Sequence, residues 1–126
     1  MDHRRLIISF WADVAAQNAE NLAARFAPGA YVLWPNTGER FTAEEFITVN
    51  CRYPGGWNAA VERVAGAGDE MVSVARVWSK TDNVSFHAVS FFAFRDGKIA
   101  SLEEYWGEDG APPAWRQALH IGGPTP

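Results

Sequence analysis

The residues best suited to acid–base chemistry are one glutamate and two histidines in the aromatic-rich second half of the sequence. Glu104 stands two positions before Trp106, His87 follows Phe86, and His120 lies near the C-terminus. In an aromatic-lined cavity, desolvation would disfavour the charged form of a carboxyl group and raise its pKa towards a range useful for proton transfer. A histidine beside it would serve as a proton shuttle. We therefore expect Glu104 to be the general acid or base, with His87 or His120 as its partner.

The motifs of several other chemistries are absent. The sequence has no glycine-rich phosphate loop, and no paired histidines or carboxylates at metal-ligand spacing. Cys51 is the only cysteine, which excludes an intrachain disulfide and a cysteine-based zinc site. Ser90 lacks the flanking glycines of a nucleophile elbow. If the chain is an enzyme, the predicted reaction is proton transfer without metal or cofactor: isomerisation, dehydration or aldol-type cyclisation.

Length and composition fit one domain over residues 1–126. Hydrophobic residues make up 48% and aromatic residues 13%, as in a folded domain with a sizeable core. The 11 basic and 15 acidic residues give a net charge of −4 without a basic cluster, so we expect neither nucleic acid nor an anionic membrane as partner. No apolar run approaches the roughly 18 residues of a membrane helix, and polar residues interrupt the N-terminal apolar stretch. The cytoplasm is the expected location.

Apolar spacing divides the chain into a helical first part and a strand-rich second part. Thr42 and Glu45 form a capping-box signature ahead of the third helix, and Asp96-Gly97 is a hairpin turn signature. The pattern predicts helices over 6–15, 18–26 and 43–51, and strands over 30–34, 57–65, 70–79, 84–95 and 98–106. This order predicts an α+β fold in which helices cover one face of a curved antiparallel sheet and leave a cavity.

The tail, residues 107–126, is rich in glycine and proline but contains two apolar anchors, Trp115 and Ile121. We expect it to dock on the body. Docking across the mouth of the cavity would bring His120 near a ligand, while docking elsewhere would leave it on the surface. The sequence leaves open whether the tail covers its own cavity or that of a neighbouring copy.

Several sequence segments resemble those of the nuclear transport factor 2-like superfamily, and within it those of the SnoaL-like branch named for a polyketide cyclase. They are Phe26-Ala27-Pro28-Gly29-Ala30, Thr42-Ala43-Glu44-Glu45-Phe46, Arg95-Asp96-Gly97-Lys98-Ile99 and Glu104-Tyr105-Trp106. The resemblance covers roughly residues 3–107. It implies a cone in which N-terminal helices pack on a strongly curved antiparallel sheet around a pocket. It does not choose a function, because the superfamily includes isomerases, dehydratases, cyclases and transport factors.

The resemblance also permits a negative test against one branch, the ketosteroid isomerases. Those enzymes use a tyrosine on the first helix, an aspartate on the first strand and an aspartate on the penultimate strand. The matching positions here are Phe10, Trp34 and Ser90. Phenylalanine cannot donate a hydrogen bond and indole is not a base. We therefore predict that the chain is not a ketosteroid isomerase.

The same resemblance implies which strand residues face the cavity. The inward residues would be Val72, Val74, Arg76 and Trp78 on one strand, Phe86, Ala88, Ser90 and Phe92 on the next, and Leu102, Glu104 and Trp106 on the last. On the third helix, Asn50 follows Phe46 by one turn and faces the same way. The predicted ligand contacts are Trp34, Phe46, Asn50, Arg76, Trp78, Ala88, Ser90, Leu102 and Trp106.

Two placements remain open at this stage. Arg76 and Glu104 either form a buried ion pair that closes one end of the cone, or Arg76 stabilises negative charge on a ligand. His87 has the opposite strand parity to Ser90. It therefore faces the outer side of the sheet, unless a β-bulge turns it inward.

Three functional hypotheses follow. The first is the acid–base enzyme acting on a small apolar or aromatic molecule. The second is a ligand-binding module without chemistry. The third is a structural homodimer that buries Val89, Phe91 and His87 on the outer sheet face, which is compatible with either of the others.

Overall fold

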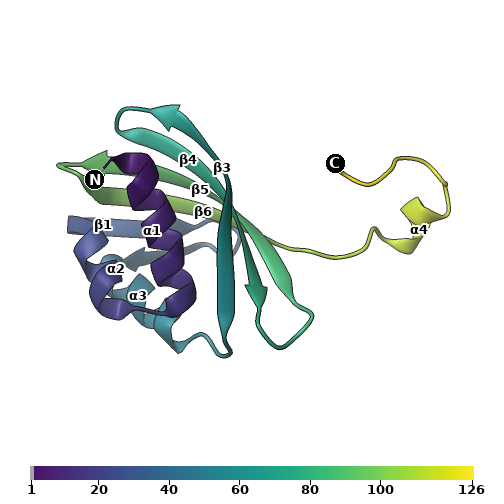
Figure 1. Ribbon diagram of the computed structural model, residues 1–126, viewed down its shortest axis with the longest axis horizontal. Helices are drawn as coiled ribbons and strands as arrows, with labels where there is room; N and C mark the ends of the chain where they lie inside the picture. Colours follow the sequence, from purple (N-terminus) through teal and green to yellow (C-terminus); the bar gives the residue numbers. More distant parts are fainter. Residues whose placement is uncertain (1) are drawn as a thin grey trace.

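The computed structural model describes residues 2–126 as three helices packed on a six-stranded sheet, followed by a C-terminal extension (Figure 1). The helices are α1 (His3–Ala16), α2 (Ala19–Arg25), α3 (Ala43–Arg52) and the short α4 (Ala114–Gln117). The strands are β1 (Phe26–Trp34), β2 (Glu39–Thr42), β3 (Trp57–Ala67), β4 (Glu70–Ser79), β5 (Ser85–Arg95) and β6 (Lys98–Glu108).

Local capping interactions define where two of the helices begin. The Asp2 side chain accepts a hydrogen bond from the backbone N–H of Arg5 at 2.8 Å and starts α1. At the start of α3 the hydroxyl of Thr42 accepts from the N–H of Glu45 at 3.1 Å, and the Glu45 carboxylate accepts from the N–H of Thr42 at 2.9 Å. The capping box predicted from the sequence is thereby confirmed.

The sheet has the strand order β2-β1-β6-β5-β4-β3 and is antiparallel except at one position. There β1 runs parallel to β6, so the sheet is mixed rather than wholly antiparallel. Strand β1 also begins earlier than expected and runs through Pro28-Gly29, where a register shift and a φ of +73° at Gly29 accommodate the irregular segment. The four-residue β2 was not predicted.

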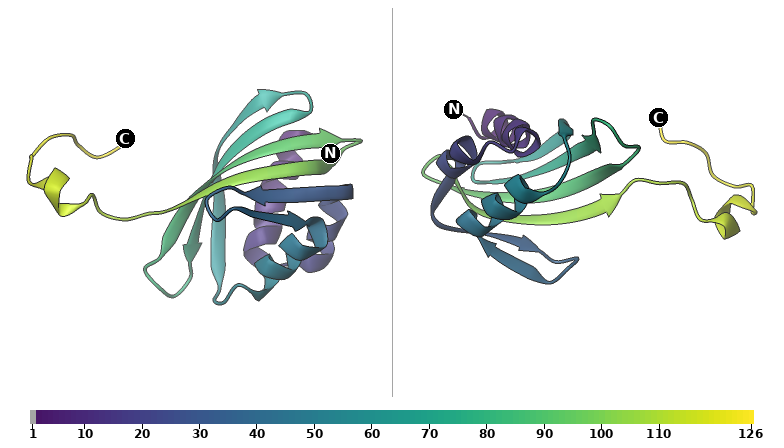
Figure 2. Two further views of the ribbon diagram at one scale, coloured as in Figure 1. Left: turned by 180° about the vertical axis from the view of Figure 1, so that it is seen from behind. Right: turned by 90° about the horizontal axis from the view of Figure 1, so that it is seen from below.

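One face of the curved sheet carries the core, and the other has no helix on it. Helices α1, α2 and α3 gather on the same side of the sheet (Figure 2). Between them lie the fully buried Phe10, Leu22 and Leu102, and the stacked rings of Phe92 and Phe94. The expected α+β cone is confirmed.

The C-terminal extension leaves the body instead of docking on it. Strand β6 continues to Glu108, and the glycine- and proline-containing segment after it carries the chain away from the sheet (Figures 1 and 2). Every residue from 107 to 126 is exposed. The structure places the tail away from its own sheet, and docking of the tail on a body stays a prediction. An extended Gly-Ala-Pro-Pro segment has no backbone ladder to bring it back.

Candidate functional site

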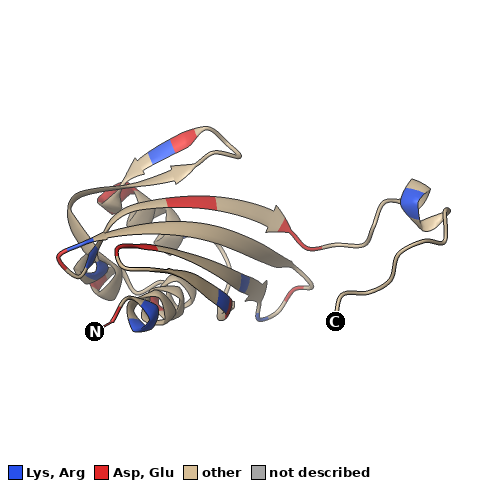
Figure 3. Cartoon of the chain, turned by 90° about the horizontal axis from the view of Figure 1, so that it is seen from above, with Lys and Arg blue, Asp and Glu red and all other residues tan. Residues whose placement is uncertain are grey.

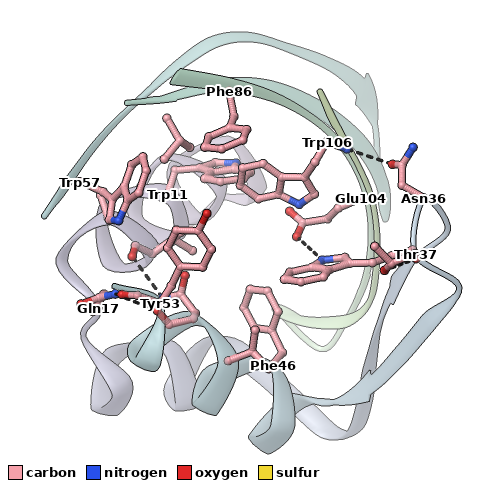
Figure 4. Close-up of a pocket in the computed structure, with 16 residues that line it drawn as sticks. Trp11, Gln17, Asn36, Thr37, Phe46, Tyr53, Trp57, Phe86, Glu104 and Trp106 are labelled. Atoms are coloured by element: carbon pink, nitrogen blue, oxygen red, sulfur yellow. Dashed lines mark hydrogen bonds between the residues drawn. The ribbon is translucent and has the colours of Figure 1, made fainter. Parts of the chain in front are cut away.

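The candidate site is a pocket of about 260 Å³ between the inner sheet face, α1 and α3 (Figure 4). Its walls are mostly aromatic and aliphatic, as in sites for small organic molecules. The lining residues are Trp11, Val14, Ala15, Gln17, Trp34, Asn36, Thr37, Phe46, Val49, Asn50, Tyr53, Trp57, Val77, Phe86, Glu104 and Trp106.

Glu104 is the one carboxyl group among these lining residues, and only 1% of it is exposed. Its position on β6 places it opposite Ser90 on β5. The Ser90 hydroxyl donates to Oε2 at 2.7 Å, and the indole N–H of Trp34 donates to Oε1 at 3.1 Å (Figure 4). Both oxygens are thus held by donors from neighbouring strands, and the carboxyl group has a fixed orientation.

Burial raises the pKa of Glu104 above the ordinary value of a glutamate, because desolvation penalises the charged form. The hydrogen bonds from Ser90 and Trp34, together with the nearby indole of Trp106, oppose this shift without cancelling it. No lysine, arginine or histidine lines the pocket as the structure describes it. The site therefore holds a carboxyl group whose proton is retained to higher pH than in water.

Trp106 adds an unused donor beside this carboxyl group. Its Nε1 is buried and has no geometrically acceptable hydrogen-bond partner in residues 2–126. The ring lies next to Glu104 (Figure 4) and meets the ring of Trp34 edge-to-face. A buried donor without a partner is costly, and a ligand oxygen would satisfy it.

Aromatic rings contact one another around the pocket and fix its shape. The ring of Trp106 packs edge-to-face against Trp11, Trp34 and Phe86, with centroid distances of 5.9, 6.4 and 6.3 Å. Phe46 contacts Trp34 in the same way at 6.2 Å. Such interlocked rings form a preorganised wall that excludes water.

Amide side chains tie the two helices together at the rim. The Gln17 amide donates to the carbonyl oxygens of Asn50 and Tyr53 at 2.9 and 2.7 Å. The Asn50 amide donates to the carbonyl of Val14 at 3.1 Å. Asn50 lines the pocket as predicted, and its NH₂ group already binds α1.

Arg76 and Trp78 do not lie in the pocket, and this prediction was wrong. On β4 the inward residues are Ser73, Ala75 and Val77, so Arg76 and Trp78 face outward, where they stack at 4.8 Å. The residues on both faces of this strand are largely apolar, so the alternation of side chains did not identify the inner face. The small residues face inward because the helices pack closely there, and the indole of Trp11 donates to the Ser73 hydroxyl at 3.1 Å. The predicted pair with Glu104 does not form, because the sheet separates the two side chains.

His87 also lies on the outer face. Its Nδ1 is 2.5 Å from the Asp109 carboxylate, and its Nε2 is 2.9 Å from that of Glu62. The hydrogen bond with Asp109 is the largest cause raising the pKa of His87. Burial opposes it as the next largest effect, and the negative charges of Asp109 and Glu62 add to the rise. Although burial alone would raise the pKa of Asp109, hydrogen bonds from Ser85 and His87 and the nearby positive charges lower it. His87 therefore cannot act on a ligand in the pocket.

The remaining predicted residues fall into three groups. Trp34, Phe46 and Trp106 line the pocket as expected. Ala88 and Leu102 face inward but are fully buried in the core behind the wall, while Ser90 acts through Glu104. His120 lies in the exposed extension, away from the pocket.

The sequence interpretation missed most of the α1 contribution to the wall. Val14 and Ala15 follow Trp11 by about one turn, so helical spacing from that tryptophan would have found them. Gln17, Tyr53 and Thr37 lie at element ends, where the side-chain direction does not follow from periodicity.

Within residues 2–126 no group of three or more His, Cys, Asp or Glu side chains is arranged to hold a metal ion. None of the described helices is both long and apolar enough to cross a membrane.

The chain was compared with known proteins. The SnoaL-like domain family matches residues 7–102. Comparison with curated proteins gives no match. Among solved structures, a proposed ketosteroid isomerase from Kribbella flavida is 24% identical with a TM-score of 0.79, covering 97% of this chain and 90% of that one. An NTF2-like protein of unknown function from Burkholderia xenovorans is 20% identical with a TM-score of 0.76, covering 97% and 94%.

A third structure extends the comparison to cyclases. A proposed SnoaL-like polyketide cyclase from Jannaschia is 16% identical with a TM-score of 0.68, covering 82% of this chain and 83% of that one. At these identities the three structures establish a shared fold. Since the family match spans most of the sequence and the cone agrees with these structures, the chain belongs to the SnoaL-like domain family.

Proposed function

We propose that the chain is a cofactor-free acid–base enzyme that moves a proton on a small, largely apolar ring compound. The observation that carries this proposal is Glu104, a carboxyl group 1% exposed, without a counter-charge, in the wall of an aromatic pocket. Because its pKa is raised, the protonation equilibrium of Glu104 is shifted towards neutral pH, as general acid–base catalysis requires.

The substrate is a ring compound with an oxygen placed beside Glu104. A volume of about 260 Å³ suits one or two fused rings, and the aromatic walls offer stacking surfaces to them. The unpartnered N–H of Trp106 would bind a carbonyl or hydroxyl oxygen placed beside Glu104.

The reaction requires only two groups. The ionised Glu104 removes a proton from the carbon next to the carbonyl, and the C–H electron pair moves to form an enolate. Trp106 donates to the enolate oxygen, while Ser90 and Trp34 hold the carboxyl group in place. In a ketone with a β,γ double bond, return of the proton from Glu104 to the γ-carbon moves the double bond into conjugation and regenerates the carboxylate. In a substrate with a second carbonyl, attack of the enolate on that carbon forms the ring bond, and Glu104 returns its proton to the resulting alkoxide. Isomerase and cyclase in the names of two similar structures support these reaction types only by shared fold.

The assembly that we propose for this activity is a homodimer through the outer sheet face. Phe91 is 45% and Tyr105 40% exposed on this face, which no helix covers. Exposed apolar patches of this kind mark association surfaces.

Deuterium exchange in D₂O tests the acid–base function directly. The probes are 2-indanone, 2-tetralone and cyclohexanone, and ¹H NMR follows loss of the signals of the carbons beside the carbonyl. We expect acceleration of at least one ketone, and a 10²- to 10⁴-fold loss of it in Glu104→Gln, the range general acid–base catalysis contributes. Glu20→Gln is the matched control, because Glu20 is exposed on α2 outside the pocket and the outer sheet face, and it should retain the wild-type rate. Exchange by Glu104→Gln at the wild-type rate would remove Glu104 from the mechanism.

The second candidate is a ligand carrier, favoured by the presence of a single carboxyl group in the pocket. Native mass spectrometry of protein purified from a cell extract separates the two. A carrier retains one molecule per chain and accelerates no exchange, whereas the enzyme releases its ligand and accelerates exchange.

A further inference from the structure

The C-terminal extension carries large apolar side chains that nothing in its own chain covers. We define the arm as residues 110–126, because Asp109 is still held to the body: its N–H donates to the carbonyl of Ser85 at 2.9 Å. Beyond it, Trp115 is 67%, Leu119 54% and Ile121 75% exposed. A helix as short as α4 is not stable in water by itself. The fold of the arm therefore requires a surface outside the arm.

An apolar surface of matching character lies on the uncovered sheet face. We define the outer patch as Val72, Val74, Val89, Phe91 and Tyr105. The strand register places Val72 opposite Phe91, and Val89 between Val74 and Tyr105, so these residues form neighbouring cross-strand rows. The rings of Phe91 and Tyr105 meet edge-to-face at 6.2 Å.

The arm and the outer patch also have complementary charges. The arm contains Arg116 and no acidic residue, as the single blue segment of Figure 3 shows, while the rest of the chain has 10 basic and 15 acidic residues. At the edge of the patch, Glu103 accepts from the Tyr105 hydroxyl at 3.1 Å and has no cation paired with it in the described part of the chain. The cationic arm thus fits an acidic body that has an unpaired carboxylate beside its apolar patch.

The direction of the arm favours a second copy over its own body. The arm points away from its own sheet in every view (Figures 1 and 2).

The arm is part of the fold shared with two solved structures. The Kribbella and Burkholderia proteins each cover 97% of this chain, which leaves about four of the 126 residues outside the comparison. Most of the arm is therefore included. The Jannaschia protein covers only 82%.

We infer that the arm is exchanged between two copies of this chain, each arm packing its apolar side chains on the outer patch of the other copy. This inference rests on the homodimer of the proposed function and names the segment that holds it together. Trp115, Leu119 and Ile121 become buried on the second copy, and Arg116 comes to lie near Glu103 of the second copy. An exchanged arm buries the apolar side chains of the arm and the outer patch at once, and it keeps the direction in which the arm leaves its own sheet (Figure 1).

Photo-crosslinking of the full-length protein locates the arm. Trp115 is replaced by p-benzoylphenylalanine, and equal amounts of ¹⁴N- and ¹⁵N-labelled protein are mixed and illuminated. We expect mixed-isotope dimers in which residue 115 is joined to peptides within residues 72–105. Crosslinks within one chain, or crosslinks to the pocket rim near residue 53, overturn the inference.

Sedimentation of charged variants measures the energetic contribution of both surfaces. Leu119→Glu in the arm and Phe91→Glu in the patch should each raise the dimer dissociation constant at least ten-fold. Ile8→Glu is the matched control, because Ile8 is 50% exposed on α1 and lies outside both surfaces. Dimers that withstand Leu119→Glu but not Phe91→Glu refute the arm and leave the homodimer standing. A wild-type monomer at 10 µM refutes both, and the ketone exchange assay still tests the acid–base function independently.

Discussion

Residues of the same type lie in opposite environments on the two faces of β5 and β6. Phe92 is 2% exposed in the core while its neighbour Phe91 is 45% exposed. Glu104 is buried in the pocket wall, and its neighbour Glu103 faces the outer side and accepts from Tyr105. Each pair differs only in the direction of its side chain, so the tertiary environment alone separates a candidate catalytic group from a surface group.

The titratable groups on the two faces are shifted by different forces. On the inner face desolvation dominates and raises the pKa of Glu104, which has no charged partner. On the outer face hydrogen bonds and opposite charges dominate, raising the pKa of His87 and lowering that of Asp109. A charge isolated from water is suited to exchanging a proton, whereas a paired, half-exposed charge is suited to holding strands together.

The largest contrast is expected between alanine substitutions at the two phenylalanines. Phe92→Ala should lower the free energy of unfolding by about 3–5 kcal/mol, because it leaves a cavity among Phe10 and Phe94. Phe91→Ala should cost about 1 kcal/mol or less when measured on dilute protein. Urea denaturation measures both. Equal losses would contradict the division into a core face and an association face.

Glu104→Gln should stabilise the protein increasingly as the pH rises. The folded-state pKa of Glu104 lies above its unfolded value, so the carboxyl group contributes most favourably below that unfolded value. As the pH rises, the unfolded state ionises first and the wild type loses stability, by roughly 1.4 kcal/mol for each unit that separates the two pKa values. The variant lacks this loss. Thermal unfolding between pH 4 and pH 9 measures the difference.

Glu20→Gln is the control outside the pocket and the outer sheet face, and its unfolding temperature should follow that of the wild type across this range. If Glu104→Gln were instead most stabilising at pH 4, the pKa of Glu104 would be lowered, and the proposed role of desolvation would be wrong.

The smallest effect is expected for His87→Gln. Protonated His87 pairs with Asp109 and Glu62, so its contribution is fully present below the unfolded histidine pKa and is lost as the pH rises through the raised folded pKa. The lowered pKa of Asp109 adds a contribution that is lost as the pH falls through that value. Because the cluster is partly exposed, the variant should lose less than about 1 kcal/mol at pH 5.5 and nothing measurable at pH 9. A constant loss at both pH values would indicate a packing effect instead.

The sequence was informative wherever local periodicity or turn chemistry decides the structure. The capping box at Thr42 predicted α3 correctly, and the parity implied by the family resemblance placed Phe86 and Phe92 on the inner face of β5 correctly. It failed at β4, where either face satisfies the apolar pattern, and Arg76 was therefore assigned to the wrong side. It also failed at β1, because a strand through Pro28-Gly29 depends on pairing with β6, which comes some seventy residues later.

The amino-acid sequence by itself determined the α+β class and the three N-terminal helices. These follow from interactions within a few residues of each other. Only the tertiary structure decided that Trp34 and Ser90 hold that glutamate, that His87 lies on the opposite face, and that the arm leaves its own body. Each of these depends on strand register and on contacts between distant segments, which local spacing does not encode.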